Sequence, residues 1–354
     1  MAIDAAIKEG AQFGYDDHPI HSEPGDLPAQ VQAPLAPFRG REPDAPEWFL
    51  DAIAHEPERS FVTSLGSRIE VLTWGEVGKP GLLLAHGNSA HADWWSFIAP
   101  ALARDYRVAS MSLAGMGASD WRDRYCFEDF AEDAEAVAQA AGLYGGARKP
   151  IYIGHSFGGS QVFFAAAQHP ERMAAAILVD VGFGGPPPDS PEGKRMAAMQ
   201  ARNIPTTDRS AKVYPTLEAA LARFRFMPPQ VAGNLFIADY IARKSLKRAP
   251  LADGSGEGWT WRFDPNMWLK LDRSSMMMGM GASGPPPVKV PMAHIYGERS
   301  AIIARADIRA NSPLPANVLE IVIPDSAHHI MVDQPLALVA CLRGLLAGWP
   351  NGPA

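Results

Sequence analysis

Residues 150–160 of the chain read PIYIGHSFGGS, and this stretch decides the fold. The run at 150–153 is apolar and rich in β-formers, whereas residues 161–168 have helical spacing. Between them lies a G-x-S-x-G pattern centred on Ser156. A strand that turns directly into a helix strains the serine backbone, and small neighbours two positions away relieve the crowding. The pattern predicts an exposed Ser156 hydroxyl beside the free N–H groups of the following helix.

Short apolar runs alternate with helical stretches on both sides of this turn. We expect strands at 61–64, 68–74, 81–87, 106–113, 150–156, 175–182, 290–298 and 318–326, and helices at 127–141, 161–168 and 334–349. The first two strands are expected to form a hairpin. Alternating strands and helices predict an α/β fold with a mostly parallel sheet and helices on both faces.

The alternation is interrupted once. Runs rich in proline and glycine, GFGGPPPDSPEGK and MMMGMGASGPPP, bound a Met- and aromatic-rich segment with helical spacing. We therefore divide the chain into an N-terminal arm (1–46), a core (47–182 and 289–354) and an inserted, mainly helical cap (183–288). The arm has no apolar periodicity, so we expect it to lie on the surface or to be mobile. Whether it forms a homodimer contact or covers the cap is left open.

Composition excludes several classes of function. The 354 residues include 32 Lys and Arg against 39 Asp and Glu, a net charge of −7 with no basic stripe, which disfavours a nucleic-acid partner. The start lacks the pattern of an export signal, and no run reaches the roughly 18 apolar residues of a membrane span, so a cytoplasmic protein is expected. Cys126 and Cys341 have neither disulfide-framework nor zinc-site spacing. We expect no metal and no organic cofactor.

Four landmarks in order carry a resemblance to a known family. They are His86-Gly87-Asn88, the turn at 113–120 (LAGMGASD), the Ser156 elbow and Ala327-His328. Over residues 47–350 the chain resembles the α/β-hydrolase superfamily. The resemblance implies an eight-stranded sheet, Ser156 as nucleophile, His328 as base, and the backbone N–H groups of Asn88 and Phe157 as oxyanion hole.

A serine needs a general base to accept its proton as it attacks. His328 follows the last strand run and precedes Pro335 at the interval usual in the superfamily, so we prefer it to its neighbour His329. We regard His86, His91 and His155 as bystanders.

The acid that orients the histidine departs from the commonest pattern. Most members have Asp three residues after a glycine that ends the seventh strand, but here Gly297 is followed by Glu298, Arg299 and Ser300. A serine cannot stabilise an imidazolium by charge. Asp180 lies at the alternative position after the sixth strand, an arrangement that haloalkane dehalogenases and zearalenone-type lactonases resemble. We choose Asp180 and keep Glu298 as the rival.

A serine at the elbow argues for acyl transfer, because epoxide hydrolase and dehalogenase chemistry in this superfamily resembles attack by an aspartate. Trp94, Trp261 and Met276 are our candidates for an apolar pocket, although such residues also pack a cap onto its core. We expect hydrolysis of an ester or lactone of a bulky small molecule. Three alternatives remain: a carbon–carbon bond hydrolase, a haloperoxidase-like side activity, and a weakly catalytic ligand sensor, which some plant hormone receptors resemble.

Overall fold

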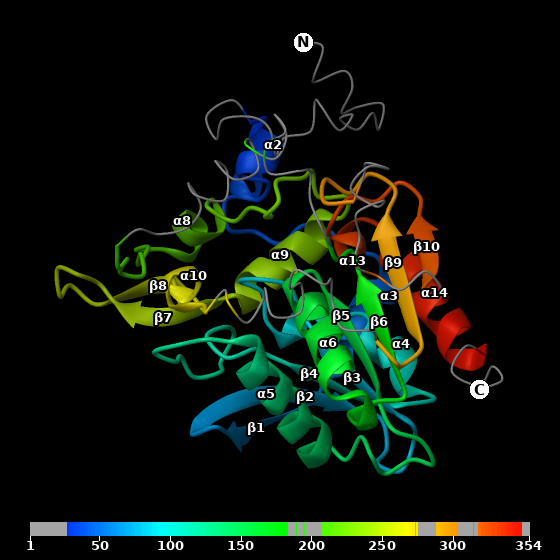
Figure 1. Ribbon diagram of the computed structural model, residues 1–354. Helices are drawn as coiled ribbons and strands as arrows, with labels where there is room; N and C mark the ends of the chain where they lie inside the picture. Colours follow the sequence, from blue (N-terminus) through cyan, green and yellow to red (C-terminus); the bar gives the residue numbers. More distant parts are fainter. Residues whose placement is uncertain are drawn as a thin grey trace.

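An eight-stranded sheet forms the centre of the molecule in this computed structural model (Figure 1). The structure describes residues 27–182, 189, 194, 207–272, 274, 288–303, 314 and 318–348. The strands run in the order β1-β2-β4-β3-β5-β6-β9-β10, and β2 is antiparallel to both of its neighbours while the others pair in parallel. The sheet that the sequence predicts, mostly parallel and eight-stranded, is confirmed.

The strands are short, and those in the middle of the sheet are buried over their whole length. Their bounds are β1 Glu58–Ser64, β2 Ser67–Trp74, β3 Gly81–Ala85, β4 Arg107–Met111, β5 Ile151–His155, β6 Ala175–Val179, β9 Met292–Gly297 and β10 Leu319–Ile323. Because successive side chains point to opposite faces, a run such as Leu82-Leu83-Leu84 supplies both layers of the core.

Helices cover both faces of the sheet. On one face lie α5 (Phe127–Ala140) and α6 (Phe157–Gln168), which pack against each other. On the other lie α3 (Glu47–Ala54), α4 (Ala99–Ala103) and α14 (Pro335–Gly348). Shorter turns complete the core: η3 Ala92–Trp95, η4 Pro170–Arg172 and α13 Ile330–Asp333. Each face therefore has its own cluster of buried apolar side chains.

The described part of the predicted insertion, residues 207–272, lies above the sheet edge at which the parallel strands end, and we call it the cap segment (Figure 1). It contains α8 (Leu217–Leu221), α9 (Leu235–Lys244), α10 (Met267–Lys270), and the antiparallel strands β7 (Leu246–Pro250) and β8 (Glu257–Trp261). The helices agree with the mainly helical cap that the sequence predicts, whereas the two strands are not predicted from it. Alternating burial along β8, in which Gly258 and Thr260 are buried, explains why this stretch forms a strand.

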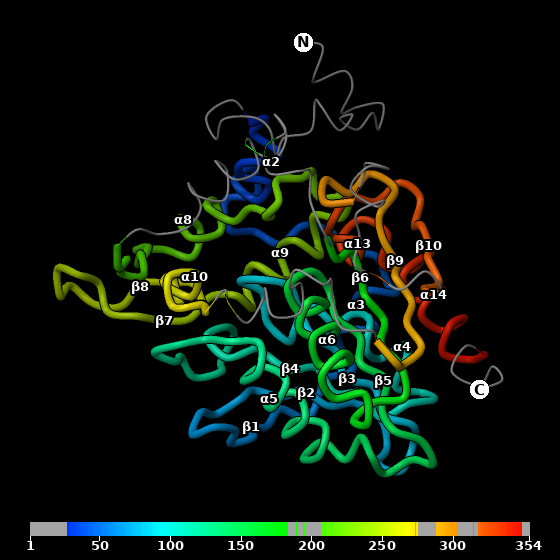
Figure 2. The backbone as a smooth tube through the Cα atoms, in the orientation of Figure 1, coloured from blue at the N-terminus to red at the C-terminus, as the bar shows by residue number. Residues whose placement is uncertain are grey.

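The end of the predicted arm is packed onto the molecule. Its short helices α2 (Ala29–Gln32) and η2 (Ala36–Phe38) lie beside the cap segment (Figure 2). Val31 and Leu35 are buried, and Arg243 of α9 donates a 2.7 Å hydrogen bond to the Gly40 carbonyl. Val31 and Leu35 stand among prolines and glycines and form no regular apolar pattern that could be recognised in the sequence. Their burial nevertheless helps to hold this part of the arm on the molecule.

No helix within the described residues has the length and apolar character needed to cross a bilayer.

Candidate active site

Ser156 lies at a tight turn between β5 and α6, in a backbone conformation that residues other than glycine rarely adopt. Its φ is 51° and its ψ is −119°. A Cβ on Gly154 would lie 2.5 Å from the Gly158 carbonyl oxygen, and a Cβ on Gly158 would lie 2.4 Å from the His86 carbonyl oxygen. The glycines of the motif are thus required by close backbone approach. The turn holds the Ser156 side chain at the carboxyl edge of the sheet.

Two hydrogen bonds join Ser156, His328 and Asp180. The Ser156 Oγ lies 3.0 Å from His328 Nε2, and His328 Nδ1 lies 2.7 Å from Asp180 Oδ1. A carboxylate only accepts, so Nδ1 carries the proton and Nε2 presents a lone pair to the serine hydroxyl. His328 is 2% and Asp180 0% exposed, which keeps this charge-assisted contact away from water. The chain brings together side chains 172 and 148 positions apart.

The Asp180 carboxylate is held by two further donors. Its Oδ2 accepts a 2.8 Å bond from the Gly297 backbone N–H, and its Oδ1 accepts a 2.6 Å bond from the Ser300 hydroxyl. Asp180 itself has a positive φ of 49° at the end of β6. Ser300, which cannot serve as the acid, instead orients the acid from the position that most of the superfamily gives to aspartate. This contact could not be predicted from local sequence, because it joins residues 120 positions apart.

Neither Glu298, the alternative acid, nor His329, the alternative base, lies in the hydrogen-bonded series that leads to Ser156. Glu298 is exposed, and its Oε2 accepts a 3.1 Å bond from the Asp325 backbone N–H. The His329 ring nitrogen Nδ1 lies 2.6 Å from Gln230 Oε1 rather than beside Ser156. The geometry therefore places Asp180 and His328, and not Glu298 or His329, in line with the serine.

The backbone N–H groups of Asn88 and Phe157 are both free for a ligand. Neither donates a hydrogen bond to any residue that the structure describes. Phe157 is the first residue of α6, where an N–H has no partner within the helix. Gly87 brings the other loop close to the serine, since a Cβ there would lie 3.3 Å from Ser156 Cβ. Two donors on two loops thus lie close to the nucleophile.

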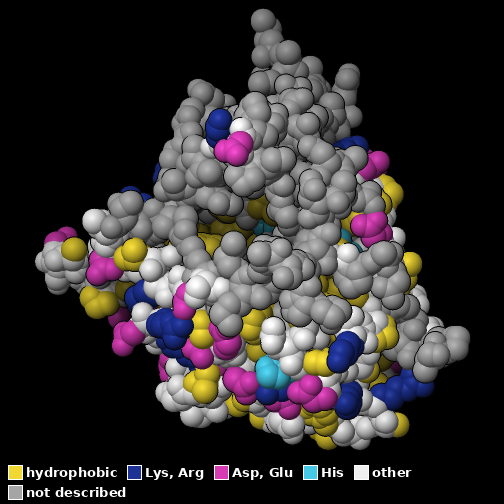
Figure 3. Space-filling view, viewed as in Figure 1, with side chains coloured by type: hydrophobic (Ala, Val, Ile, Leu, Met, Phe, Trp, Pro, Cys, Tyr) yellow, Lys and Arg dark blue, Asp and Glu magenta, His cyan; other side chains and the backbone are white. Residues whose placement is uncertain are grey.

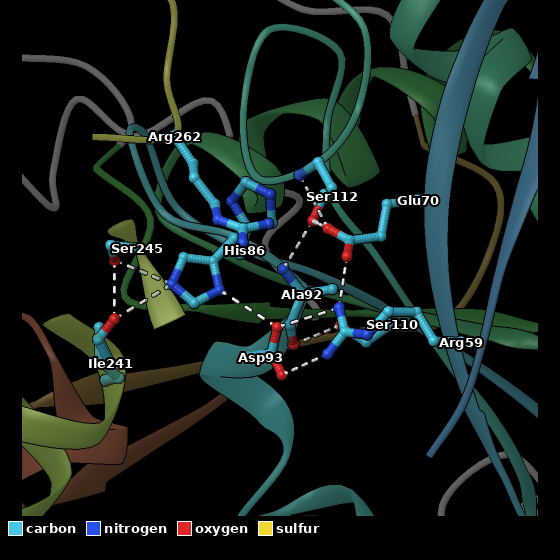
Figure 4. A network of polar contacts seen from close by, with 12 residues as sticks. Arg59, Glu70, His86, Ala92, Asp93, Ser110, Ser112, Ile241, Ser245 and Arg262 are labelled. Atoms are coloured by element: carbon cyan, nitrogen blue, oxygen red, sulfur yellow. Dashed lines mark hydrogen bonds and ion pairs between the residues drawn. The ribbon is translucent and has the colours of Figure 1, made fainter. Parts of the chain in front are cut away.

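A buried polar network supports the loop that carries Asn88 (Figure 4). Arg59 of β1 bonds to Glu70 and, at 2.8 Å, to Asp93 Oδ1. Burial opposes ionisation of Asp93, but His91, whose Nδ1 lies 3.6 Å from Asp93 Oδ2, and the hydrogen-bonded Arg59 outweigh it and lower the Asp93 pKa. The network ties the loop at 86–93 to strands β1 and β2 on the sheet. None of these contacts was anticipated from the sequence.

Histidines around the site are held neutral. His86 Nε2 accepts a 3.0 Å bond from the Leu113 N–H, and burial lowers the His86 pKa to about 3. His155 Nε2 lies 3.0 Å from the His328 carbonyl oxygen, and burial followed by the nearby His328 lowers the His155 pKa. A neutral His155 donates to that carbonyl and fixes the backbone of His328. Both residues, which we took for bystanders, thus make contacts that position the site.

A cavity of about 700 Å³ lies between the core and the cap segment, and apolar side chains are visible in the hollow of Figure 3. Aromatic side chains form a large part of its wall. Its lining includes Asn88, Trp94, Met116, Tyr214, Phe224, Phe226, Trp261, Phe263, Met267, Trp268 and His329. Arg209, Arg223 and Arg225 also line it. The lining thus combines apolar, mainly aromatic surface with several polar and charged groups, among them Asp264.

The predicted pocket residues have different outcomes. Trp94 and Trp261 line the cavity, one from the core and one from the cap segment. Met276 lies outside the described residues. Within the described part of the chain, no three His, Cys, Asp or Glu side chains gather as metal ligands would.

Comparison with known proteins identifies the family. A family described as alpha/beta hydrolase fold matches residues 80–335. An esterase of Mycobacterium tuberculosis is 23% identical over 296 residues, covering 78% of this chain and 86% of its own. Epoxide hydrolase A of the same organism is 31% identical over 128 residues, covering 35% of this chain. That match spans only 39% of the epoxide hydrolase, and two other relatives are matched over 58% and 41% of their lengths.

The fold itself is shared with solved hydrolase structures. The chain is similar to E-2-(acetamidomethylene)succinate hydrolase with a TM-score of 0.64 and 17% identity, covering 82% of this chain and all of the other. At this level of identity the similarity describes the fold alone.

Proposed function

Because this chain belongs to the α/β-hydrolase fold family, we propose that it is a serine hydrolase that cleaves an ester or lactone of a bulky, largely apolar small molecule. Ser156 is the nucleophile, His328 the general base and Asp180 the acid. The N–H groups of Asn88 and Phe157 form the oxyanion hole. The observation that carries the proposal is the pair of hydrogen bonds, 3.0 and 2.7 Å long, that joins the three side chains.

The geometry supports a two-stage reaction. As Ser156 Oγ attacks the substrate carbonyl carbon, its proton passes to His328 Nε2. Asp180 stabilises the imidazolium that forms, and its own contacts to Gly297 and Ser300 keep it in place. The tetrahedral intermediate then expels the alcohol, which takes the proton from Nε2, and leaves an acyl group on Ser156.

The second stage reverses these roles with water. His328 removes a proton from a water molecule that attacks the acyl carbon, and the carboxylic acid product leaves as Oγ recovers that proton from Nε2. In both stages negative charge develops on the carbonyl oxygen beside the free N–H groups of Asn88 and Phe157. One such donor typically stabilises the transition state by about 3 kcal/mol.

The nature of the elbow residue favours acyl transfer over epoxide opening. Relatives of this chain include both esterases and an epoxide hydrolase. Epoxide opening in this superfamily resembles attack by an aspartate, whereas residue 156 is a serine. The aromatic cavity favours bulky apolar substrates. A carbon–carbon bond hydrolase uses the same catalytic residues, and a ligand sensor would keep the cavity without turnover.

We would test this proposal by measuring hydrolysis of p-nitrophenyl esters of increasing acyl length and of aromatic lactones. We expect turnover of at least one ester or lactone, and a loss of at least about 1,000-fold in kcat in Ser156→Ala. Binding of these compounds without turnover in the wild-type protein would support the sensor instead. Activity that survives in Ser156→Ala would contradict the proposed nucleophile.

A further inference from the structure

A second histidine lies beside the proposed catalytic base and takes no part in the hydrogen-bonded triad. The ring of His329 lies 4.8 Å from that of His328 and 5.5 Å from that of His155, measured between centroids. His329 lines the cavity, unlike His328 and Ser156, and it is 4% exposed. It is therefore well placed to contact a substrate bound next to the reacting atoms.

Hydrogen bonds fix which ring nitrogen of His329 carries a proton. Gln230 Oε1 accepts from the His329 backbone N–H at 2.9 Å and lies 2.6 Å from His329 Nδ1. The orientation of the Gln230 amide is not ambiguous, because its Nε2 donates a 3.0 Å bond to the Asp333 carboxylate. Since the Gln230 oxygen can only accept, Nδ1 must be the protonated nitrogen.

The Asp333 carboxylate links the cap segment to the loop that carries His328 and His329. It also accepts bonds from the backbone N–H groups of Ala327, at 2.9 Å, and Gly233, at 3.0 Å. Gly233 and Gln230 belong to the cap segment, whereas Ala327 belongs to the loop that carries both histidines. The orientation of His329 is therefore set by buried contacts on both sides rather than by a flexible surface.

The other ring nitrogen of His329 has no protein partner among the residues that the structure describes. Burial, followed by the nearby His328 and His155, lowers the His329 pKa, so the ring is neutral and Nε2 offers a lone pair. His329 lines the cavity and its Nδ1 contacts Gln230, which does not, so we place the ring edge that includes Nε2 toward the cavity. His329 thus presents one acceptor to the cavity.

The surroundings of that acceptor are aromatic. The ring of Phe226 lies 4.8 Å and that of Trp94 5.6 Å from the His329 ring, and both residues line the cavity. An acceptor in an apolar wall loses its water when a ligand fills the cavity, which is unfavourable unless the ligand supplies a donor. Sites of this kind discriminate strongly against ligands that lack the matching group.

From this geometry we propose that His329 Nε2 accepts a hydrogen bond from a hydroxyl group of the substrate. The inference rests on the proposed function and narrows its substrate class to esters that carry such a donor near the scissile bond. His329 is then a specificity-determining residue, while Gln230 and Asp333 are positioning residues that act through it.

Matched pairs of esters test the inference. We would measure kcat/KM for methyl hexanoate against methyl 2-hydroxyhexanoate and 3-hydroxyhexanoate, and for butyl hexanoate against 2-hydroxybutyl hexanoate. Acid release recorded at constant pH reports each rate. At least one hydroxylated ester should exceed its unsubstituted partner by about 10-fold or more in the wild-type enzyme. That ratio should fall to about 1 in His329→Leu.

Two further variants separate a role in recognition from a role in folding. His329→Gln keeps an acceptor and should retain part of the ratio, whereas Gln230→Leu frees the ring and should lower it. The control is His169→Leu, at the end of α6 and outside the cavity lining, which should leave the ratio unchanged. If thermal denaturation shows that His329→Leu is not folded, the ratio in Gln230→Leu tests the role of His329 instead.

The failure of this inference differs from the failure of the proposed function. Hydrolysis that depends on Ser156 but shows no preference for any hydroxylated ester would overturn the role of His329 alone. A preference that survives intact in His329→Leu, or in Gln230→Leu where the first variant is unfolded, would also overturn it. An absence of ester and lactone hydrolysis in the wild-type protein would contradict the proposed function as well.

Discussion

The strand ends of the core and the cap segment contribute to one site in different ways. At the strand ends, Ser156 and Asp180 are held in strained backbone conformations with φ of 51° and 49°, and Asp180 accepts three hydrogen bonds. The cap segment supplies many aromatic side chains to the cavity, including Phe226 and Trp261. Backbone strain and a full set of hydrogen bonds hold the reacting groups in fixed positions, whereas the aromatic wall of the cavity fits the shape of the substrate. Changes in the reacting groups at the strand ends should therefore reduce every reaction, and changes in the cavity wall of the cap segment should reorder substrates.

The largest expected effect tests the acid of the core. Asp180→Asn should lower kcat by about 1,000- to 10,000-fold for all substrates, because an amide cannot stabilise the imidazolium of His328. Steady-state kinetics on the best ester, with circular dichroism to check folding, provide the measurement. Glu298→Gln is the matched control, since Glu298 is exposed and bonds to Asp325, and it should keep normal turnover. The reverse pattern would reassign the acid.

A smaller loss of turnover is expected when the support of that acid is weakened. Ser300→Ala removes the 2.6 Å donor to Asp180 Oδ1 but leaves the bonds from Gly297 and His328. Losing one hydrogen bond to a buried carboxylate costs about 1.5–3 kcal/mol, so kcat should fall by roughly 10- to 100-fold with little change in KM. Ser300→Thr, which keeps the hydroxyl, should recover much of the loss. Equal activity in Ser300→Ala and wild type would show that the contact is dispensable.

The neutral histidines of the core predict a dependence of stability on pH. Burial lowers the His86 pKa from 6.5 to about 3, so below pH 6.5 the unfolded chain binds a proton that the folded chain excludes. The free energy of unfolding should fall as the pH drops from 6.5 toward 3, with His86 contributing about 1.4 kcal/mol per pH unit. Urea titrations at several pH values in this range give the slope of the free energy of unfolding against pH. In His86→Gln this slope should be smaller by the contribution of one proton. An identical slope in both proteins would contradict the assignment.

The smallest effect is expected in the cap segment, and it should depend on the substrate. Trp261→Ala enlarges the cavity, so the acyl length with the highest kcat/KM should shift upward while the best rate changes only about 3- to 10-fold. Trp259→Ala, on the same strand but outside the cavity lining, is the control and should keep the wild-type order. A uniform loss across all substrates in Trp261→Ala would mean that the two regions do not divide their roles.

The extent of prediction from sequence differs between the same two regions. The sheet and the elbow are encoded locally: apolar runs such as GLLLA and the glycines around Ser156 carry their structure in a few neighbouring residues. The strands of the cap segment escaped prediction, because only Leu246 of β7 is buried and the run LKRAP has no alternating pattern.

Contacts between distant residues could not be predicted either. The bond from Ser300 to Asp180 and the contact of Gln230 with His329 join positions 120 and 99 residues apart, and nothing in their local sequence marks them as partners. The buried Val31 and Leu35 are a similar case, since proline and glycine around them hide any apolar period. Residue types at strand ends predict the catalytic groups that we propose, but the contacts that hold those groups are visible only in the fold.

Labelling with a fluorophosphonate probe tests the central claim most directly, because only an activated serine attacks the phosphorus. Mass spectrometry of the digested protein should locate one adduct on the peptide that contains Ser156. The adduct should be absent in Ser156→Ala and should form far more slowly in His328→Gln. An unlabelled wild-type protein, or an adduct on another serine, would contradict the account.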